Sequence, residues 1–148
     1  DGSFSMDRGG ALPVNAVVKL CFSGLSLQEI KRRLGTESGV YSYLGTRDFR
    51  EVEARMLSGD EQATLIFQAM AFQHAKDIGA LAAVLRFDVD AIVFTGGIAY
   101  SSRFCDELSG YVQKIAPIIR IPGEEEMRAL AEGALRVLGG EPAKEYPA

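Results

Sequence analysis

The sequence predicts an α/β fold that is rich in helices up to about residue 85 and then continues as strand, helix, strand and helix. Two observations support this order. Apolar residues recur at the three-to-four-residue spacing of helices through the first part of the chain. Two short β-branched segments then follow, Val89–Thr95 and Pro117–Ile121, separated by a helical pattern over Ser102–Ile115. Because parallel strands need a long connection, we expect these segments to pair in parallel across that helix.

The helical patterns have recognisable ends. Ser26 and Glu29 form a Ser-x-x-Glu capping box, and Asp48 is expected to cap a later helix. Residues 36–46 predict a loop with little regular structure. Gly79 and several alanines in the long helix permit close approach of a neighbouring helix or sheet. The expected helices cover residues 14–23, 27–34, 48–57, 60–85, 102–115 and 124–138.

Composition and charge exclude several function classes. The 148 residues, of which 47% are hydrophobic and 24% charged, suffice for one folded core. A net charge of −4 argues against nucleic-acid binding, and no apolar run is long enough to predict a membrane span. Cys21 and Cys105 fit neither a disulfide framework nor a metal motif, which predicts a reducing, cytoplasmic compartment. The chain begins at Asp1 without a signal-like segment, and we expect a fragment lacking an N-terminal part.

Two segments carry candidate binding residues. Gly96 and Gly97 follow the first strand, where an α/β sheet binds ligands and where the backbone of glycine can approach a ring or a phosphate. The alternative is a simple strand-to-helix turn. In Asp48-Phe49-Arg50, a ring or guanidinium can stack on a purine and the carboxylate can accept from a ribose hydroxyl. The alternative is a helix start, with Asp48 as its cap and Phe49 as an anchor.

Charged residues outside these segments have two interpretations each. Arg8, set among glycines, has the bidentate geometry to clamp a carboxylate or phosphate, although exposed arginines are common. Glu124 and Glu126 either complement the dipole of the last helix, or one of them holds a magnesium ion through water.

Several tracts together resemble one family. Asp90–Ser101 resembles the adenosine motif of the acetate and butyrate kinases, and Gly45–Glu53 resembles their nucleotide-contacting Asp-Phe-Arg segment. Ser5–Pro13 is similar to the loop that carries the active-site arginine of these enzymes. Pro122–Leu138 is similar to the C-terminal signature of the butyrate kinase subfamily. The resemblance covers essentially the whole chain in unbroken order.

This resemblance implies a particular fold. The chain would be the C-terminal lobe of the ribonuclease H-like fold shared by the sugar kinase–Hsp70–actin superfamily, with the early strands of the sheet lying outside this chain. Within one domain of residues 1–148, residues 1–13 would form the active-site loop and 14–85 a helical region. Residues 86–140 would form the β–α–β–α unit, and 141–148 a tail.

The resemblance also implies an activity, the reversible transfer of a phosphoryl group from ATP to butyrate or a branched short-chain acid, with Mg²⁺. Arg8 would be catalytic, and Glu124 or Glu126 would lie on the metal side. The partners would be ATP or ADP, a short-chain carboxylate or acyl phosphate, the missing N-terminal lobe, and a second copy in a homo-oligomer. The chain alone is expected to be inactive. The nucleotide would be bound by Asp48, Phe49, Arg50, Gly96, Gly97 and Ile98.

The sequence departs from the family patterns at two places. Ala99-Tyr100-Ser101 stand where acetate kinases have Gly-Glu-Asn, so the asparagine that would touch adenine is absent. Met6-Asp7 replace the Pro-Glu of the usual butyrate kinase loop. Three alternatives therefore remain: an acetate or propionate kinase, a non-catalytic nucleotide-binding or interaction module of the same superfamily, and a helical α/β domain with no ligand.

Overall fold

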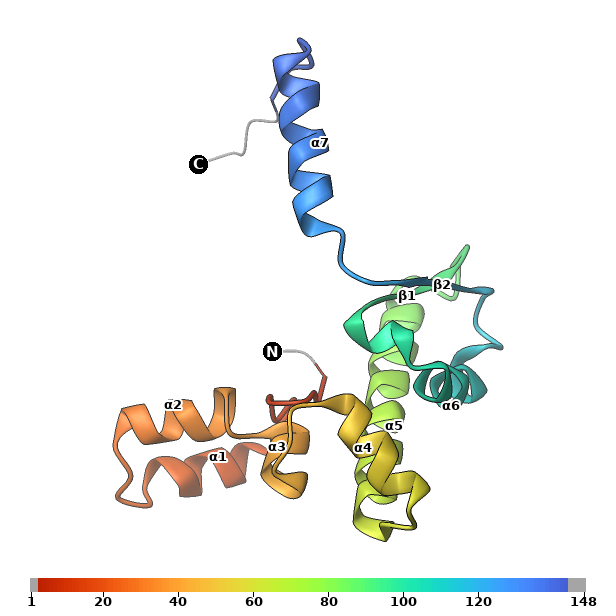
Figure 1. Cartoon of the computed structure of the whole chain (residues 1–148). Coiled ribbons are helices and arrows are strands. Elements are labelled where there is room, and N and C mark those ends of the chain that lie inside the picture. Colours follow the sequence, from red (N-terminus) through yellow and green to blue (C-terminus); the bar gives the residue numbers. More distant parts are fainter. Residues whose placement is uncertain (1–2, 144–148) are drawn as a thin grey trace.

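A computed structural model describes residues 3–143 (Figure 1). This part of the chain is a helix-rich α/β structure, as the sequence predicts. Its elements are α1 (Val14–Cys21), α2 (Leu27–Gly35), α3 (Gly39–Leu44), α4 (Phe49–Leu57), α5 (Glu61–Val84), β1 (Ile92–Gly96), the 3₁₀ helix η1 (Gly97–Tyr100), α6 (Ser102–Val112), β2 (Ile118–Pro122) and α7 (Glu126–Leu138).

The two strands pair in parallel, with Ile92 opposite Ile118 at one end and Gly96 opposite Pro122 at the other. The helix α6 connects them, which confirms the predicted crossover. The predicted strand bounds are shifted, because the ladder forms only where both segments have a partner residue. The prediction that the last helix begins at Glu124 is wrong. Gly123, with φ of +100°, first forms an antiparallel bridge to Gly96, so the helix starts at Glu126.

The predicted loop over residues 36–46 is instead largely helical, because it contains α3. Two backbone N–H groups at the start of α3 donate to the opening loop, from Val40 to the carbonyl of Ser5 (2.9 Å) and from Tyr41 to that of Met6 (2.8 Å). Their acceptors lie some thirty-five residues earlier in the sequence, so local spacing does not reveal them. A glycine in the left-handed region, Gly45, ends the helix.

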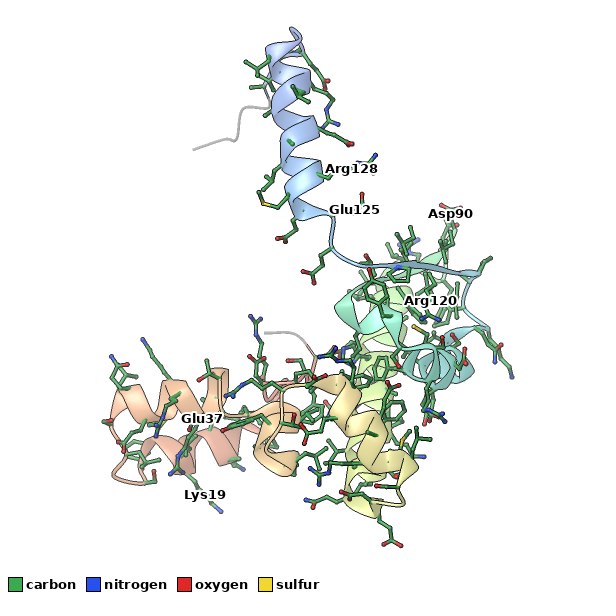
Figure 2. The ribbon with its side chains drawn as sticks, in the orientation of Figure 1. Lys19, Glu37, Asp90, Arg120, Glu125 and Arg128 are labelled. Carbon is green, nitrogen blue, oxygen red and sulfur yellow. The ribbon has the colours of Figure 1, made fainter. Side chains whose placement is uncertain are left out.

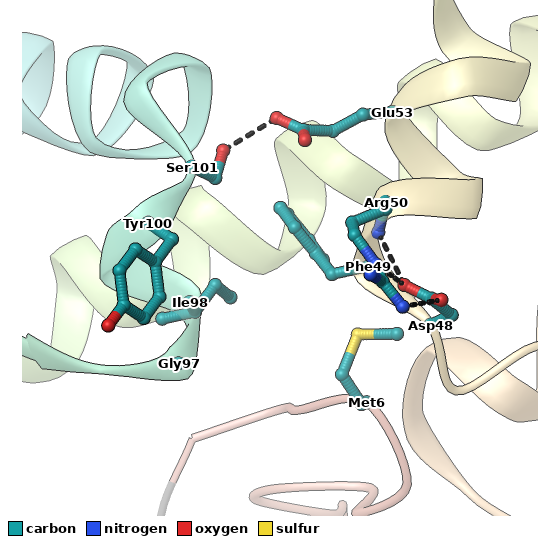
Figure 3. A pocket seen from close by; sticks show the side chains of 9 residues that line it. All are labelled: Met6, Asp48, Phe49, Arg50, Glu53, Gly97, Ile98, Tyr100 and Ser101. Atoms are coloured by element: carbon teal, nitrogen blue, oxygen red, sulfur yellow. Dashed lines mark hydrogen bonds and ion pairs between the residues drawn. The ribbon is translucent and has the colours of Figure 1, made fainter. Parts of the chain in front are cut away.

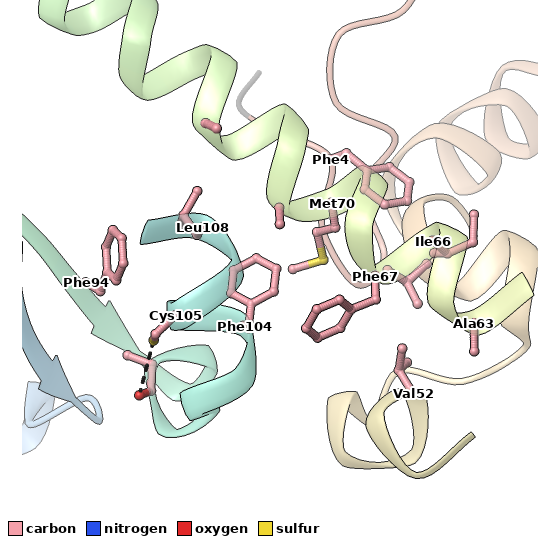
Figure 4. Packing of buried hydrophobic residues seen from close by; sticks show 14 of the residues in the cluster. Phe4, Val52, Ala63, Ile66, Phe67, Met70, Phe94, Phe104, Cys105 and Leu108 are labelled. Atoms are coloured by element: carbon pink, nitrogen blue, oxygen red, sulfur yellow. Dashed lines mark hydrogen bonds between the residues drawn. The ribbon is translucent and has the colours of Figure 1, made fainter. Parts of the chain in front are cut away.

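The core lies between α4, α5 and α6, with α5 in the middle (Figure 4). Val52, Met70 and Val112 are fully buried there. The close approach that the small residues of α5 permit occurs at its buried alanines, such as Ala71 and Ala75, and not at Gly79, where an added Cβ would meet nothing within 4 Å. Leu81, from the predicted apolar stripe of α5, is exposed. Val84 on the last turn of α5 is exposed as well, whereas Ala82 between them is buried.

Three helices bury no residue: α1, α2 and α7. Figure 1 shows α1 and α2 side by side at one end of the molecule, and α7 projecting beyond the strands at the other. On α7, Met127 and Leu138 are more than three-quarters exposed. Arg128 forms ion pairs with Glu125 (3.3 Å) and Glu132 (2.8 Å), along the polar side of this helix (Figure 2).

Both cysteines are free: Cys21 is exposed and Cys105 is buried, and burial raises the pKa of the Cys105 thiol. Among the helices of residues 3–143, none has the length and hydropathy needed to cross a membrane.

Candidate functional site

A cavity of about 610 Å³ lies between the start of α4 and the turn that follows β1 (Figure 3). It brings together two segments that are almost fifty residues apart in the sequence. Five of the six predicted nucleotide-binding residues line it, whereas Gly96 does not. Its lining residues are Met6, Asp48, Phe49, Arg50, Glu53, Gly97, Ile98, Tyr100 and Ser101.

Asp48 and Arg50 form the charged rim of this cavity. The Asp48 side chain caps α4 by accepting from the backbone N–H of Arg50 (2.9 Å). Its two carboxylate oxygens also accept from the Arg50 guanidinium, at 3.0 Å and 2.7 Å. These side-chain hydrogen bonds lower the pKa of Asp48 and raise that of Arg50. The predicted capping role of Asp48 is thus confirmed, while its carboxylate and the guanidinium remain accessible to a ligand.

Phe49 belongs both to the cavity and to the core. Its ring stacks on Phe67, with centroids 5.5 Å apart and planes 25° apart, and meets the edge of Phe104 at 5.3 Å. It therefore is the anchor that one interpretation of the sequence predicts. Because it also lines the cavity, it supplies an apolar wall whose position is fixed by two buried aromatic rings.

The two glycines after β1 have different structural roles. Gly96 has φ of +78°, a conformation that other residues rarely adopt, so it is needed for the turn itself. Gly97 begins η1, and a Cβ built there would meet no protein atom within 4 Å. The missing side chain at Gly97 therefore leaves open space at the cavity, where a ligand can approach the backbone.

Arg8 does not line this cavity. It is exposed and borders a second hollow of about 580 Å³, formed by the opening loop together with α1 and α2. Met6, two residues earlier, lines the first cavity. The opening loop thus reaches both hollows, and the structure leaves the catalytic role of Arg8 a prediction.

Glu124 and Glu126 also lie outside the cavity, and both are exposed. A Cβ built on Gly96 would be 3.5 Å from Oε1 of Glu124, so this carboxylate adjoins the end of β1. Within residues 3–143, no three His, Cys, Asp or Glu side chains come together as a metal site. Magnesium bound to a nucleotide needs only one or two protein carboxylates beside phosphates and water, so an exposed Glu124 fits that role. The metal role of either glutamate stays a prediction.

Four cavity residues are not among the predicted site residues: Met6, Glu53, Tyr100 and Ser101. Glu53 lies one helical turn after Phe49, so helical periodicity places the two on one face of α4. Ser101 precedes α6 and caps it, accepting from the N–H of Phe104 at 2.9 Å. The sequence contains the helical spacing of Glu53 and the capping position of Ser101. That the two residues face each other across the cavity depends on the tertiary fold.

Comparison with known proteins supports the interpretation of these segments. Residues 7–121 match the model of the acetokinase family. Over 148 residues the chain is 47% identical to butyrate kinase 1 of Clostridium acetobutylicum, a match that covers 99% of this chain and 42% of that protein. The chain therefore spans less than half the length of this curated relative.

Solved structures show the same fold at lower identity. The acetate kinase of Porphyromonas gingivalis aligns with a TM-score of 0.80 and 21% identity, over 93% of this chain and 41% of that one. A propionate kinase from Francisella tularensis aligns with a TM-score of 0.73 and 24% identity, over 86% of this chain and 39% of that one. The predicted fold is confirmed as part of the acetate kinase structure. Since the family model covers both segments of the cavity and most of the chain, this chain belongs to the acetokinase family.

Proposed function

We propose that this chain supplies the adenosine-binding side of a kinase that transfers a phosphoryl group reversibly between ATP and a short-chain carboxylate. The cavity between α4 and η1 is the observation that carries the proposal. Its volume of about 610 Å³ is in the range of small-molecule sites. Its two walls consist of the segments that resemble the nucleotide-contacting segments of the family.

The lining residues have the chemistry that an adenosine needs. Phe49 and Ile98 offer an apolar wall for the base, and Gly97 leaves space for close approach. The Asp48 carboxylate accepts from a ribose hydroxyl, and Arg50 attracts the phosphates. Arg50 would exchange part of its pairing with Asp48 for a phosphate, because both side chains lie at the exposed rim.

Phosphoryl transfer to a carboxylate depends on positioning and on charge neutralisation. We assign Arg8 to the equatorial oxygens of the transferred group, where a guanidinium stabilises the charge of the transition state. Glu124 or Glu126 would hold magnesium, which when bound neutralises charge on the nucleotide phosphates. The carboxylate substrate is already ionised at neutral pH, so the chain needs no strong general base.

We propose butyrate, or a branched acid of similar size, as the acceptor. The 47% identity to a butyrate kinase supports this choice. So does Ala99-Tyr100-Ser101, which departs from the acetate kinase pattern.

The test is to express the full reading frame that contains this chain and to measure acyl phosphate formation with butyrate and with acetate. Each methylene in an apolar pocket changes specificity by about tenfold or more, so kcat/KM should favour butyrate at least about tenfold. A higher kcat/KM with acetate would make the protein an acetate kinase. ADP binding without turnover on any short-chain acid would make it a non-catalytic nucleotide-binding module.

A further inference from the structure

One side-chain hydrogen bond joins the two walls of the cavity directly, among the residues that the structure describes. The hydroxyl of Ser101 donates to Oε1 of Glu53, with 2.6 Å between the oxygens (Figure 3). Glu53 comes from α4, the wall that carries Asp48, and Ser101 follows η1, the wall that carries Gly97. Both side chains are half-buried at the cavity.

The geometry at Ser101 makes this bond directional. Its oxygen accepts the backbone N–H of Phe104 at 2.9 Å and so caps α6. A serine hydroxyl has one proton to donate, and that proton goes to Glu53. Because the acceptor is a carboxylate, the bond is charge-assisted and stronger than one between neutral groups. The start of α6 and the middle of α4 are thereby held together.

The opposite side of the same turn is held by Arg120 of β2. Its guanidinium donates to the backbone carbonyls of Ala99 and Tyr100, the latter at 2.8 Å, and to the hydroxyl of Ser102 at 3.0 Å. Arg120 therefore fixes η1 to the sheet, whereas Glu53 fixes the end of η1 to α4. The position of Gly97 relative to Asp48 depends on both attachments.

We propose that Glu53 is a positioning residue for the nucleotide: through Ser101 it sets the separation of the α4 and η1 walls, so that both contact one nucleotide. This inference rests on the proposed function of the cavity. Glu53 acts on binding geometry and does not contact the transferred phosphoryl group. Its loss should weaken binding of ATP and ADP and leave the rate of the bound complex nearly unchanged.

The experiment uses the protein from the full reading frame and measures the Kd for ADP by calorimetry, together with kcat and KM for ATP. Glu53→Ala should raise both the Kd for ADP and the KM for ATP about tenfold, with kcat within about twofold. Glu53→Gln should restore most of the affinity, because its amide oxygen still accepts from Ser101. Glu107→Ala, which removes a carboxylate from α6 outside the cavity, is the matched control and should change neither constant.

A second variant tests the partner without removing the helix cap. Ser101→Gly deletes the hydroxyl, and glycine is itself tolerated at the N-cap. It should raise the Kd for ADP as Glu53→Ala does, and the double variant should be no worse than either single one. Should Glu53→Ala fail to fold, Ser101→Gly and Glu53→Gln carry the same test.

An unchanged Kd for ADP in Ser101→Gly and Glu53→Ala would overturn the inference, and so would additive losses in the double variant. A fall in kcat at unchanged KM would also overturn it, because that result would place Glu53 in the chemical step. These outcomes differ from failure of the proposed function. In that case the unsubstituted protein would itself show neither ADP binding nor turnover.

Discussion

The cavity beside α4 and the hollow beside Arg8 are held in place by different interactions. The cavity beside α4 is built on the core, because Phe49 packs on Phe67 and Phe104. The hollow beside Arg8 is lined by the opening loop and by α1 and α2, two helices that bury no residue. The α4 wall of the proposed nucleotide site is therefore fixed by side-chain packing. The loop that carries the proposed catalytic arginine is held by the buried Phe4 and by backbone hydrogen bonds to α3, whereas the helices around its hollow are not packed into the core.

Among the substitutions that compare the two hollows, Arg8→Ala is expected to have the largest effect on kcat. Loss of an arginine that stabilises phosphoryl transfer lowers kcat by about 10³-fold or more. Because Arg8 lies outside the cavity, the Kd for ADP should stay within about twofold. Steady-state assay of acyl phosphate synthesis and calorimetry measure the two quantities. Lys31→Ala removes another cation from the same hollow and serves as the control. An Arg8→Ala enzyme with normal kcat would remove this residue from the mechanism.

Two methionine substitutions compare the contributions of the core and of the exposed helix α7 to the free energy of unfolding. Met70 is 2% exposed, and Met70→Ala should lower the free energy of unfolding by about 2–5 kcal/mol. Met127 is 80% exposed, so Met127→Ala should change the same quantity by less than about 0.5 kcal/mol. Chemical denaturation of the 148-residue chain measures both. A loss of similar size in Met127→Ala would mean that α7 is packed in solution.

A pair of glycine substitutions tests how the Arg8 loop is held. Gly39 has φ of +60°, and a Cβ there would lie 2.1 Å from the carbonyl oxygen of Ser5, inside the loop. Gly45 has φ of +73° but no atom within 4 Å of its Cβ position. Both alanine variants should lose about 1 kcal/mol of stability from backbone strain. Only Gly39→Ala should also displace the loop and lower kcat, and equal kcat values in the two variants would refute this.

The smallest expected effect is a loss of folding stability in acid, which arises from Asp48 at the rim of the cavity. Arg50 lowers the pKa of Asp48 in the folded state, so the ionised carboxylate stabilises the fold. This contribution is present above the ordinary aspartate pKa, about 3.9, and is lost as the pH falls through the lower folded value. Asp48→Asn keeps a capping side chain but has no charge. Its stability difference from the unsubstituted chain should therefore shrink between pH 7 and pH 3 in denaturation experiments.

The fold was predictable wherever local signals determine it. The predicted capping residues Ser26 and Asp48 both precede helices and accept hydrogen bonds from the first turns of those helices. The helix α3 was not predictable, because its first N–H groups find their acceptors in a loop far away in the sequence. The predicted start of α7 was wrong for a related reason, because the bridge between Gly96 and Gly123 extends the sheet past Pro122.

The residues of the candidate site also include some that were predictable from the sequence and some that were not. The resemblance identified the segments of Asp48 and Gly97, and the structure places both at one cavity. Glu53 and Ser101 lie in segments that resemble family motifs, but neither was predicted as a site residue, because neither is unusual in its local sequence. Their bond exists only because α4 and α6 both pack against α5. Sequence patterns within one segment can identify each of the two residues, but they cannot show that the residues are in contact.

The dual position of Phe49 limits which substitutions the molecule can tolerate. A smaller residue there would enlarge the cavity and at the same time remove one aromatic neighbour from each of Phe67 and Phe104. A change in nucleotide preference obtained at this residue would therefore come with a loss of thermal stability. Directed evolution toward other nucleotides has a less constrained route at Tyr100, which lines the same cavity and is 69% exposed.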